Sequence, residues 1–167
     1  MKSAVRGMNL RIETAGPVST FDRAGRALET LERVDVIRRS GRALDYRVSE
    51  VLASADRYGG ITPTELAKAV GLSPSRLSHI FRRETGYALS RYLRARRLLM
   101  AVELLTQTNE SIKAIAFETG YRHESSFVRA FTRCLSEAPG TFRRRAREGE
   151  CSQLIDVSRY RHSGTGS

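Results

Sequence analysis

The chain has 167 residues and a formal net charge of +11, from 29 Lys and Arg against 18 Asp and Glu. Residues 61–147 carry most of this excess, with 16 basic and 7 acidic side chains. A basic folded segment predicts a polyanionic partner, either nucleic acid or an acidic membrane surface. No apolar run approaches the roughly 18 residues of a membrane span, and the N-terminal residues lack the apolar core of a signal peptide.

Two cysteines, Cys134 and Cys151, stand alone in the sequence. Neither belongs to a Cys-x-x-Cys motif, and neither has a histidine at metal-ligand spacing. This pattern indicates neither a zinc site nor a disulfide framework, and it fits a reducing cytoplasm. We therefore expect a cytoplasmic protein that needs no cofactor and no metal.

The first predicted helix lies in an N-terminal segment. Residues 1–19 show no sustained periodicity, whereas 20–39 carry apolar residues at helical spacing and predict a helix. Gly41 then marks a break. A second helix is expected from Leu44 to the glycine pair that ends at Gly60.

Two sequence signals for the start of a helix follow. Thr62 and Glu65 flank Pro63 and form a capping box with proline at the first helical position, which predicts a helix over 63–70. Ser73 and Pro74 repeat the signal and open a helix over 74–85. Further helices are expected at 88–106, 111–119, 123–134 and from Pro139 to about 145. Because no stretch of 44–146 alternates like a strand, the predicted fold class is all-α.

A similar sequence pattern occurs in both halves of residues 44–146. Residues 69–81 read AVGLSPSRLSHIF, and 118–131 read ETGYRHESSFVRAF. Each combines a short helix, a glycine turn and a longer helix, which is typical of a helix-turn-helix unit. The matched positions are Leu66, Ala67, Gly71, Leu77 and Phe81 in the first copy, and Ile115, Ala116, Gly120, Phe127 and Phe131 in the second. The repeat predicts two units, 61–86 and 110–135, joined by one long helix.

The second helix of each unit is expected to turn a polar, cationic face outward. In the helix over 74–85, positions 77, 80, 81 and 84 are expected to be buried. Small residues allow the backbone to approach the major groove, and Arg can pair with guanine. The base-contact candidates are Ser75, Arg76, Ser78, His79, Arg82, Ser125, Ser126 and Arg129. The phosphate-contact candidates are Thr62, Ser73, Arg83, Arg97, Lys113, Arg133 and Arg143.

The segments 71–105, 110–131 and 138–143 closely resemble the AraC/XylS family of bacterial transcription regulators. The resemblance covers about 44–146 and implies a DNA-binding domain of seven helices, whose recognition helices enter successive major grooves. It implies that Arg97, in the long helix, is structural or faces a phosphate. The family usually has Gly at the position of Ser136 and Thr at that of Ala138, so we expect a strained helix end and a missing cap there.

Family members often carry a β-barrel sensor domain before the DNA-binding part. Only about 43 residues precede it here, and none reads as a strand. We expect residues 1–43 to be an N-terminal arm, partly helical or disordered, and 147–167 to be a disordered tail. The helix over 20–39 either docks on the domain, is disordered or pairs with a second copy. The chain is then a stand-alone regulator or a fragment of a longer one.

Three functions remain open. The first is a bacterial, nucleoid-associated transcription regulator, an activator that binds double-stranded DNA as a monomer and contacts RNA polymerase. The second is a DNA-repair alkyl-transfer enzyme, which would need an activated cysteine that neither Cys134 nor Cys151 offers. The third is a degenerate module that sequesters a related regulator through 20–39. We expect the first, with no enzymatic activity.

Overall fold

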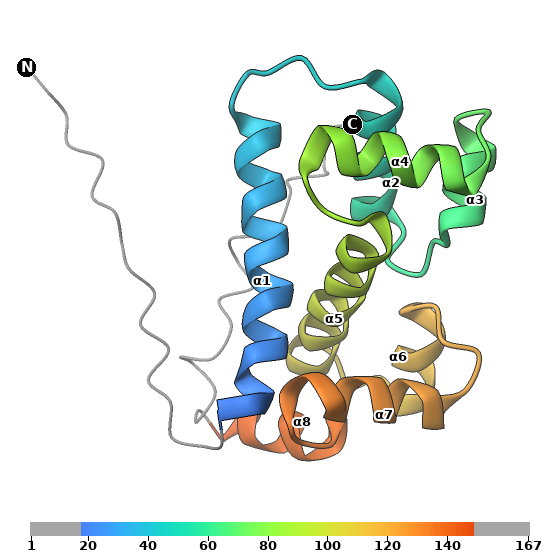
Figure 1. The fold of residues 1–167 in the computed structure, drawn as a ribbon. Coiled ribbons are helices and arrows are strands. Elements are labelled where there is room, and N and C mark those ends of the chain that lie inside the picture. Colours follow the sequence, from blue (N-terminus) through green and yellow to red (C-terminus); the bar gives the residue numbers. More distant parts are fainter. Residues whose placement is uncertain (1–17, 149–167) are drawn as a thin grey trace, which may run out of the picture.

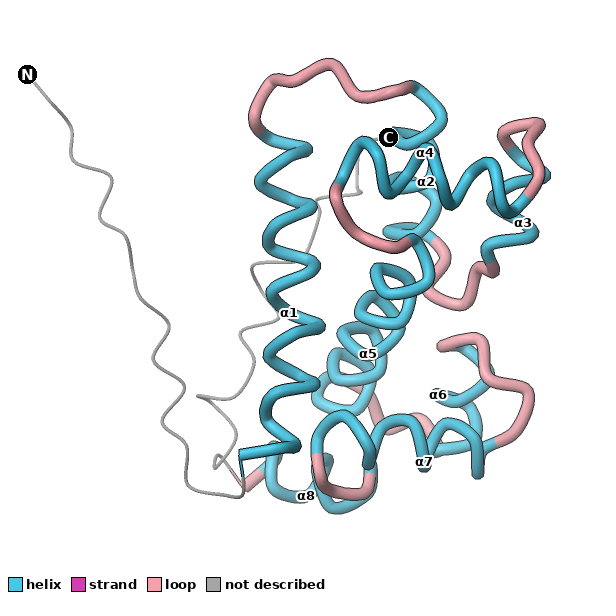
Figure 2. Tube along the Cα trace, in the orientation of Figure 1, coloured by secondary structure: helices cyan, strands magenta, loops and turns pink. Residues whose placement is uncertain are grey.

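The computed structural model describes residues 18–148, which form eight helices and no strand (Figures 1 and 2). The helices are α1 (Val18–Arg39), α2 (Tyr46–Arg57), α3 (Pro63–Ala69), α4 (Pro74–Thr85), α5 (Leu89–Gln107), α6 (Ile112–Glu118), α7 (Glu124–Leu135) and α8 (Pro139–Arg147). The all-α prediction is confirmed, and α2–α8 are the seven helices that the resemblance implies. The predicted disordered tail falls almost entirely outside the described residues.

Local capping explains where several helices begin. Thr62 and Glu65 form the predicted capping box, with the Thr62 hydroxyl accepting from the Glu65 backbone N–H at 3.2 Å. The second helix starts at Tyr46 rather than Leu44, because the Asp45 carboxylate accepts from the Arg47 backbone N–H at 3.0 Å and caps it. Leu44 instead packs against the core from the preceding loop.

The helices pack around two separate hydrophobic cores. The first joins residues of α1 to α4 with the N-terminal half of α5, as far as Leu99. The second starts at Ala101 of the same helix and includes residues of α6, α7 and α8. Each helix-turn-helix unit therefore has its own core, and α5 is the rigid connection between them.

One burial prediction for α4 is met only in part. Thr85 is buried, whereas Glu84 is only half-buried. The Thr85 hydroxyl is satisfied inside the fold, because it donates to the Phe81 carbonyl oxygen at 2.8 Å. The Glu84 side chain is 12% exposed, and its carboxylate pairs with Arg83 at 3.1 Å and Arg42 at 3.6 Å. A charged group would cost far more to bury than a hydrogen-bonded hydroxyl.

The N-terminal helix is docked on the domain. Figure 1 shows α1 running alongside α5, and α1 contacts both α5 and α7. Its Leu31 and Val34 side chains are buried in the first core. Near its C-terminal end, Arg38 pairs with Asp56 of α2 at 2.5 Å, and Asp56 also pairs with Arg96 of α5 at 2.9 Å. Of the three expectations for 20–39, docking is the one observed.

Candidate nucleic-acid interface

The second helix of the first unit, α4, has well-defined ends. The Ser73 hydroxyl accepts from the Arg76 backbone N–H at 3.2 Å, and Pro74 occupies the first turn. The helix ends at Gly86, whose φ of +78° is the left-handed conformation that favours glycine. These local signals fix the length of the helix and therefore which of its side chains face outward.

The predicted base-contact residues of α4 share one face. Ser75, Arg76, His79 and Arg82 are exposed, while Leu77, Ile80 and Phe81 are buried on the opposite side. Ser78 is half-buried, and its hydroxyl donates to the Pro74 carbonyl oxygen at 2.8 Å. The exposed face of α4 is thus small, polar and cationic.

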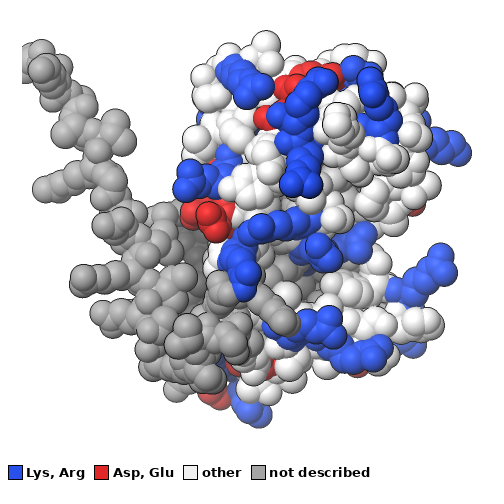
Figure 3. Space-filling view, viewed as in Figure 1, with Lys and Arg blue, Asp and Glu red and all other residues white. Residues whose placement is uncertain are grey.

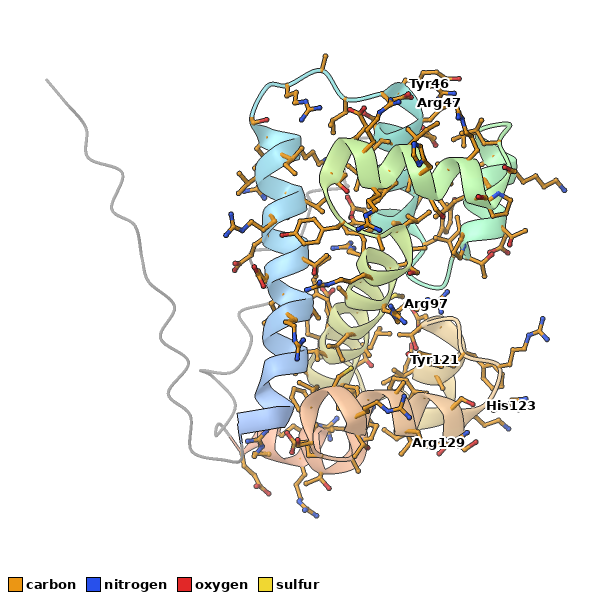
Figure 4. All side chains as sticks on the ribbon, in the orientation of Figure 1. Tyr46, Arg47, Arg97, Tyr121, His123 and Arg129 are labelled. Atoms are coloured by element: carbon orange, nitrogen blue, oxygen red, sulfur yellow. The ribbon has the colours of Figure 1, made fainter. Side chains whose placement is uncertain are left out.

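The corresponding helix of the second unit, α7, repeats this arrangement. Ser125 and Arg129 are exposed and Ser126 is half-buried, with Phe127 and Phe131 buried beneath them. Figure 4 shows Arg129 on α7 and His123 near its N-terminal end. The remaining apolar residue near this face, Val128, is half-buried and packs against the second core. Its packing is therefore inward rather than toward the polar face.

The ends of α7 have less favourable capping than those of α4. His123 occupies the N-cap position and makes no side-chain capping hydrogen bond. Ser136 follows the last turn with a φ of +61°, the strained left-handed conformation expected from the missing glycine. Ala138 precedes α8 and supplies no capping hydrogen bond, also as expected.

Several phosphate candidates have hydrogen-bond partners inside the fold. The Arg97 guanidinium donates to the carbonyl oxygens of Gly60 and Ile61, both at 3.2 Å. The Arg143 guanidinium donates to the carbonyl oxygen of Glu110 at 2.6 Å. These two arginines therefore hold loops at the starts of the two units. The Thr62 and Ser73 hydroxyls serve as helix caps, Arg83 pairs with Glu84, and Lys113 and Arg133 are exposed.

Two carboxylates near the units have shifted pKa values. Hydrogen bonds from the Thr62 hydroxyl and backbone N–H hold the pKa of Glu65 below its usual value. Partial burial, followed by hydrogen bonding and repulsion from Glu110, raises the pKa of Glu118. Glu65 thus stays ionised at the start of α3, where the helix dipole favours negative charge.

The two units touch at a pair of glycines that sequence reasoning missed. A Cβ atom added to Gly60 would lie 3.0 Å from the Gly120 Cα, and one added to Gly120 would lie 2.6 Å from the Gly60 Cα. The backbones are therefore in direct contact. Arg97 holds the same loop from α5, and Figure 4 shows it between the two units. In the sequence each glycine reads only as a local stop or turn, because the contact joins distant residues.

On the face that carries α4 and α7, basic side chains are more frequent than acidic ones. Figure 3 shows Lys and Arg spread over both units and the region between them, with few Asp and Glu in the same view. Figure 1 shows α4 and α7 on this face, one above the other, with α5 linking their units. The arrangement presents two exposed cationic helices on one side of the molecule.

Comparison with known proteins agrees with this geometry. Residues 66–145 match the model of a helix-turn-helix domain. The chain is 35% identical over 78 residues to the arabinose operon regulatory protein of Escherichia coli, covering 47% of this chain and 27% of that protein. It is 38% identical over 80 residues to the regulatory protein SoxS of Salmonella typhimurium, covering 48% of this chain and 75% of SoxS. The chain belongs to the AraC/XylS family of DNA-binding transcription regulators.

A solved structure of this AraC type also matches. The DNA-binding domain of AdpA, described as a global transcriptional factor in complex with a target DNA, has a TM-score of 0.54 and 28% sequence identity. The match covers 62% of this chain and 97% of the AdpA domain. The chain spans only 11–28% of the length of four relatives that it matches, the arabinose regulator among them.

Two further observations bear on the other predicted functions. Within residues 18–148, no helix combines the length and apolarity needed to cross a membrane. Cys134 is a half-buried cysteine on α7, and Cys151 lies outside the described residues.

Proposed function

We propose that this AraC-family protein is a sequence-specific transcription regulator that reads two successive major grooves with α4 and α7. The observation that carries the proposal is the duplication of one surface. Each helix buries its apolar side in a separate core and turns small polar and cationic residues outward. An α-helix with such a face fits the major groove, where Arg and small polar side chains reach base edges.

We propose separate roles in base contact and phosphate contact for the exposed and half-buried residues of the two units. Base contacts come from Ser75, Arg76, Ser78, His79 and Arg82 in the first unit, and from Ser125, Ser126 and Arg129 in the second. Phosphate contacts come from Lys113, Arg83 and Arg133, and from the helix starts at Thr62 and Ser73. For Arg97 and Arg143 we propose a positioning role, because their guanidinium groups already donate to backbone carbonyls.

We further propose that one chain binds DNA as a monomer and activates transcription through RNA polymerase. A single chain carries both reading helices, so an asymmetric site needs no second copy. Two adjacent major grooves on one DNA face lie about 34 Å apart. The backbone contact between Gly60 and Gly120 and the continuous α5 would hold α4 and α7 at one separation.

Selection of bound oligonucleotides from a random pool, at a defined salt concentration, tests this proposal directly. We expect an asymmetric site with two conserved blocks, one for each recognition helix. A site of one block only, or no enrichment at all, would contradict reading by both units.

Substitutions in the protein then test which helix reads which conserved block of the DNA site. Arg129→Ala should weaken binding by about 1–3 kcal/mol and relax preference at one base pair. As a control, Lys113→Ala should weaken all sequences similarly and reduce the slope of affinity against salt by about one. If Arg129→Ala keeps the wild-type preference, the assignment of α7 is wrong.

A further inference from the structure

A groove of about 620 Å³ lies between α1, α5 and α7, and none of the proposed base-contact residues lines it. The arm helix α1 forms one wall, so the groove depends on the docked position of that helix. Among the residues whose side chains are described, its lining combines arginines with apolar and small residues and contains no Asp or Glu. This combination of charge and apolar surface indicates a specific kind of ligand.

The rim of the groove carries a concentrated positive charge. In the described part of the chain, five arginines line it: Arg26 from α1, Arg91, Arg94 and Arg97 from α5, and Arg133 from α7. Arg91 donates to the Arg26 carbonyl oxygen at 3.3 Å, and Arg97 donates to the two carbonyl oxygens described above. Carbonyl acceptors satisfy these donors without cancelling their charge. The rim therefore attracts an anion.

The floor of the groove is apolar. Ala95, Ala101, Phe127 and Phe131 are buried there, and Leu98 is half-buried. Small residues at 27, 95, 101 and 130 leave the hollow between the helices. A phosphate backbone gains nothing from such a floor, whereas a hydrocarbon chain or ring gains the free energy of burying its surface.

We propose that this groove binds a small amphipathic carboxylate, with the carboxylate on the arginine rim and the hydrocarbon part on the apolar floor. The planar guanidinium fork matches a carboxylate through paired N–H donors. The volume lies within the usual range of small-molecule sites, about 300–1,000 Å³. Arg94 is exposed at the rim and offers the simplest anchor for the carboxylate. Arg133 of the rim is also a proposed phosphate contact, whereas Arg94 is not, so the proposal concerns the free protein and is tested at Arg94.

Calorimetric titration of the full chain with octanoate, and with the neutral octanamide of equal length, tests the proposal. We expect saturable binding of one octanoate per chain and affinity about tenfold lower for octanamide, the loss expected for one charge-assisted hydrogen bond. Arg94→Gln should lower octanoate affinity by a similar factor. The matched control Arg144→Gln removes the same charge from an exposed position on α8, outside the groove, and should leave affinity unchanged.

A second variant tests the apolar floor. Ala27→Leu places additional volume in the groove from the α1 wall, so octanoate affinity should fall, while the urea midpoint reports whether α1 stays docked. The proposal is overturned if octanoate does not saturate, if octanamide binds equally well, or if Arg94→Gln binds octanoate like the wild type. It is also overturned if Arg94→Gln affects only DNA affinity and its salt slope, because the rim then belongs to the DNA interface.

Discussion

Replacing Gly120 with alanine perturbs the contact that joins the two helix-turn-helix units. Gly120 has a φ of +82°, and an added Cβ would lie 2.6 Å from the Gly60 Cα and 2.7 Å from the Gly60 carbonyl oxygen. Both neighbours are backbone atoms, so no side chain can rotate away. The first unit must move relative to the second, or the turn before α7 must distort.

The cost has two parts of known size. Holding an L-residue in the left-handed conformation costs roughly 1–2 kcal/mol. Forcing a carbon atom about 1 Å inside the usual contact distance of 3.5–4.0 Å adds overpacking of roughly 1–3 kcal/mol. We therefore expect Gly120→Ala to lower the free energy of unfolding by about 2–5 kcal/mol.

The first unit supplies a matched control at the equivalent turn. Gly71 has a φ of +67°, and an added Cβ meets nothing within 4 Å. Gly71→Ala should therefore lower the free energy of unfolding only by the backbone term, about 1–2 kcal/mol. Urea denaturation of both variants, followed by circular dichroism, measures the difference, which we expect to be about 1–3 kcal/mol.

The comparison can refute the proposed contact between units. If the two alanine variants lose the same free energy within about 0.5 kcal/mol, the glycine pair does not hold the units together. Gly60→Ala gives an independent check, because its Cβ would lie 3.0 Å from the Gly120 Cα. We expect a smaller loss there, since the contact is less severe.

Three further predictions test the arm, a helix end and a helix cap. Val34→Ala should lower the free energy of unfolding by about 1.5–3 kcal/mol, because Val34 is 1% exposed. Val36 on the same helix is 65% exposed, so Val36→Ala should change it by no more than about 0.5 kcal/mol. Equal losses in urea denaturation would mean that α1 is not docked in solution. Ser136→Gly should raise the free energy of unfolding by about 1 kcal/mol by relieving the left-handed residue, and a lower thermal midpoint would contradict this. Hydrogen bonds from the Arg47 side chain and backbone lower the pKa of Asp45 to about 2. Because the folded pKa is below the unfolded value, the contribution of this carboxylate is present above about pH 4 and is lost as the pH falls toward 2. The stability difference between wild type and Asp45→Asn should therefore shrink over that range, and a constant difference in urea midpoint would refute it.

Local sequence signals predicted helix starts well because the capping atoms lie within three residues of each other. The Thr62 and Ser73 caps appear as expected, and the left-handed Ser136 confirms the strain inferred from a missing glycine. Thr85 was not among the residues expected to be buried, because helical spacing allows either position 84 or position 85 to face inward. The partners available to each side chain then decide which one is buried.

The sequence by itself determined the all-α class, the two copied units and the identity of the residues on their outer faces. Each of these depends on hydrophobic period and on caps, which act over a few neighbouring residues. Only the tertiary structure decided that α1 docks beside α5, that Gly60 meets Gly120, and that arginines from three helices surround one groove. These features join residues tens of positions apart, and the packing of the whole chain brings them together.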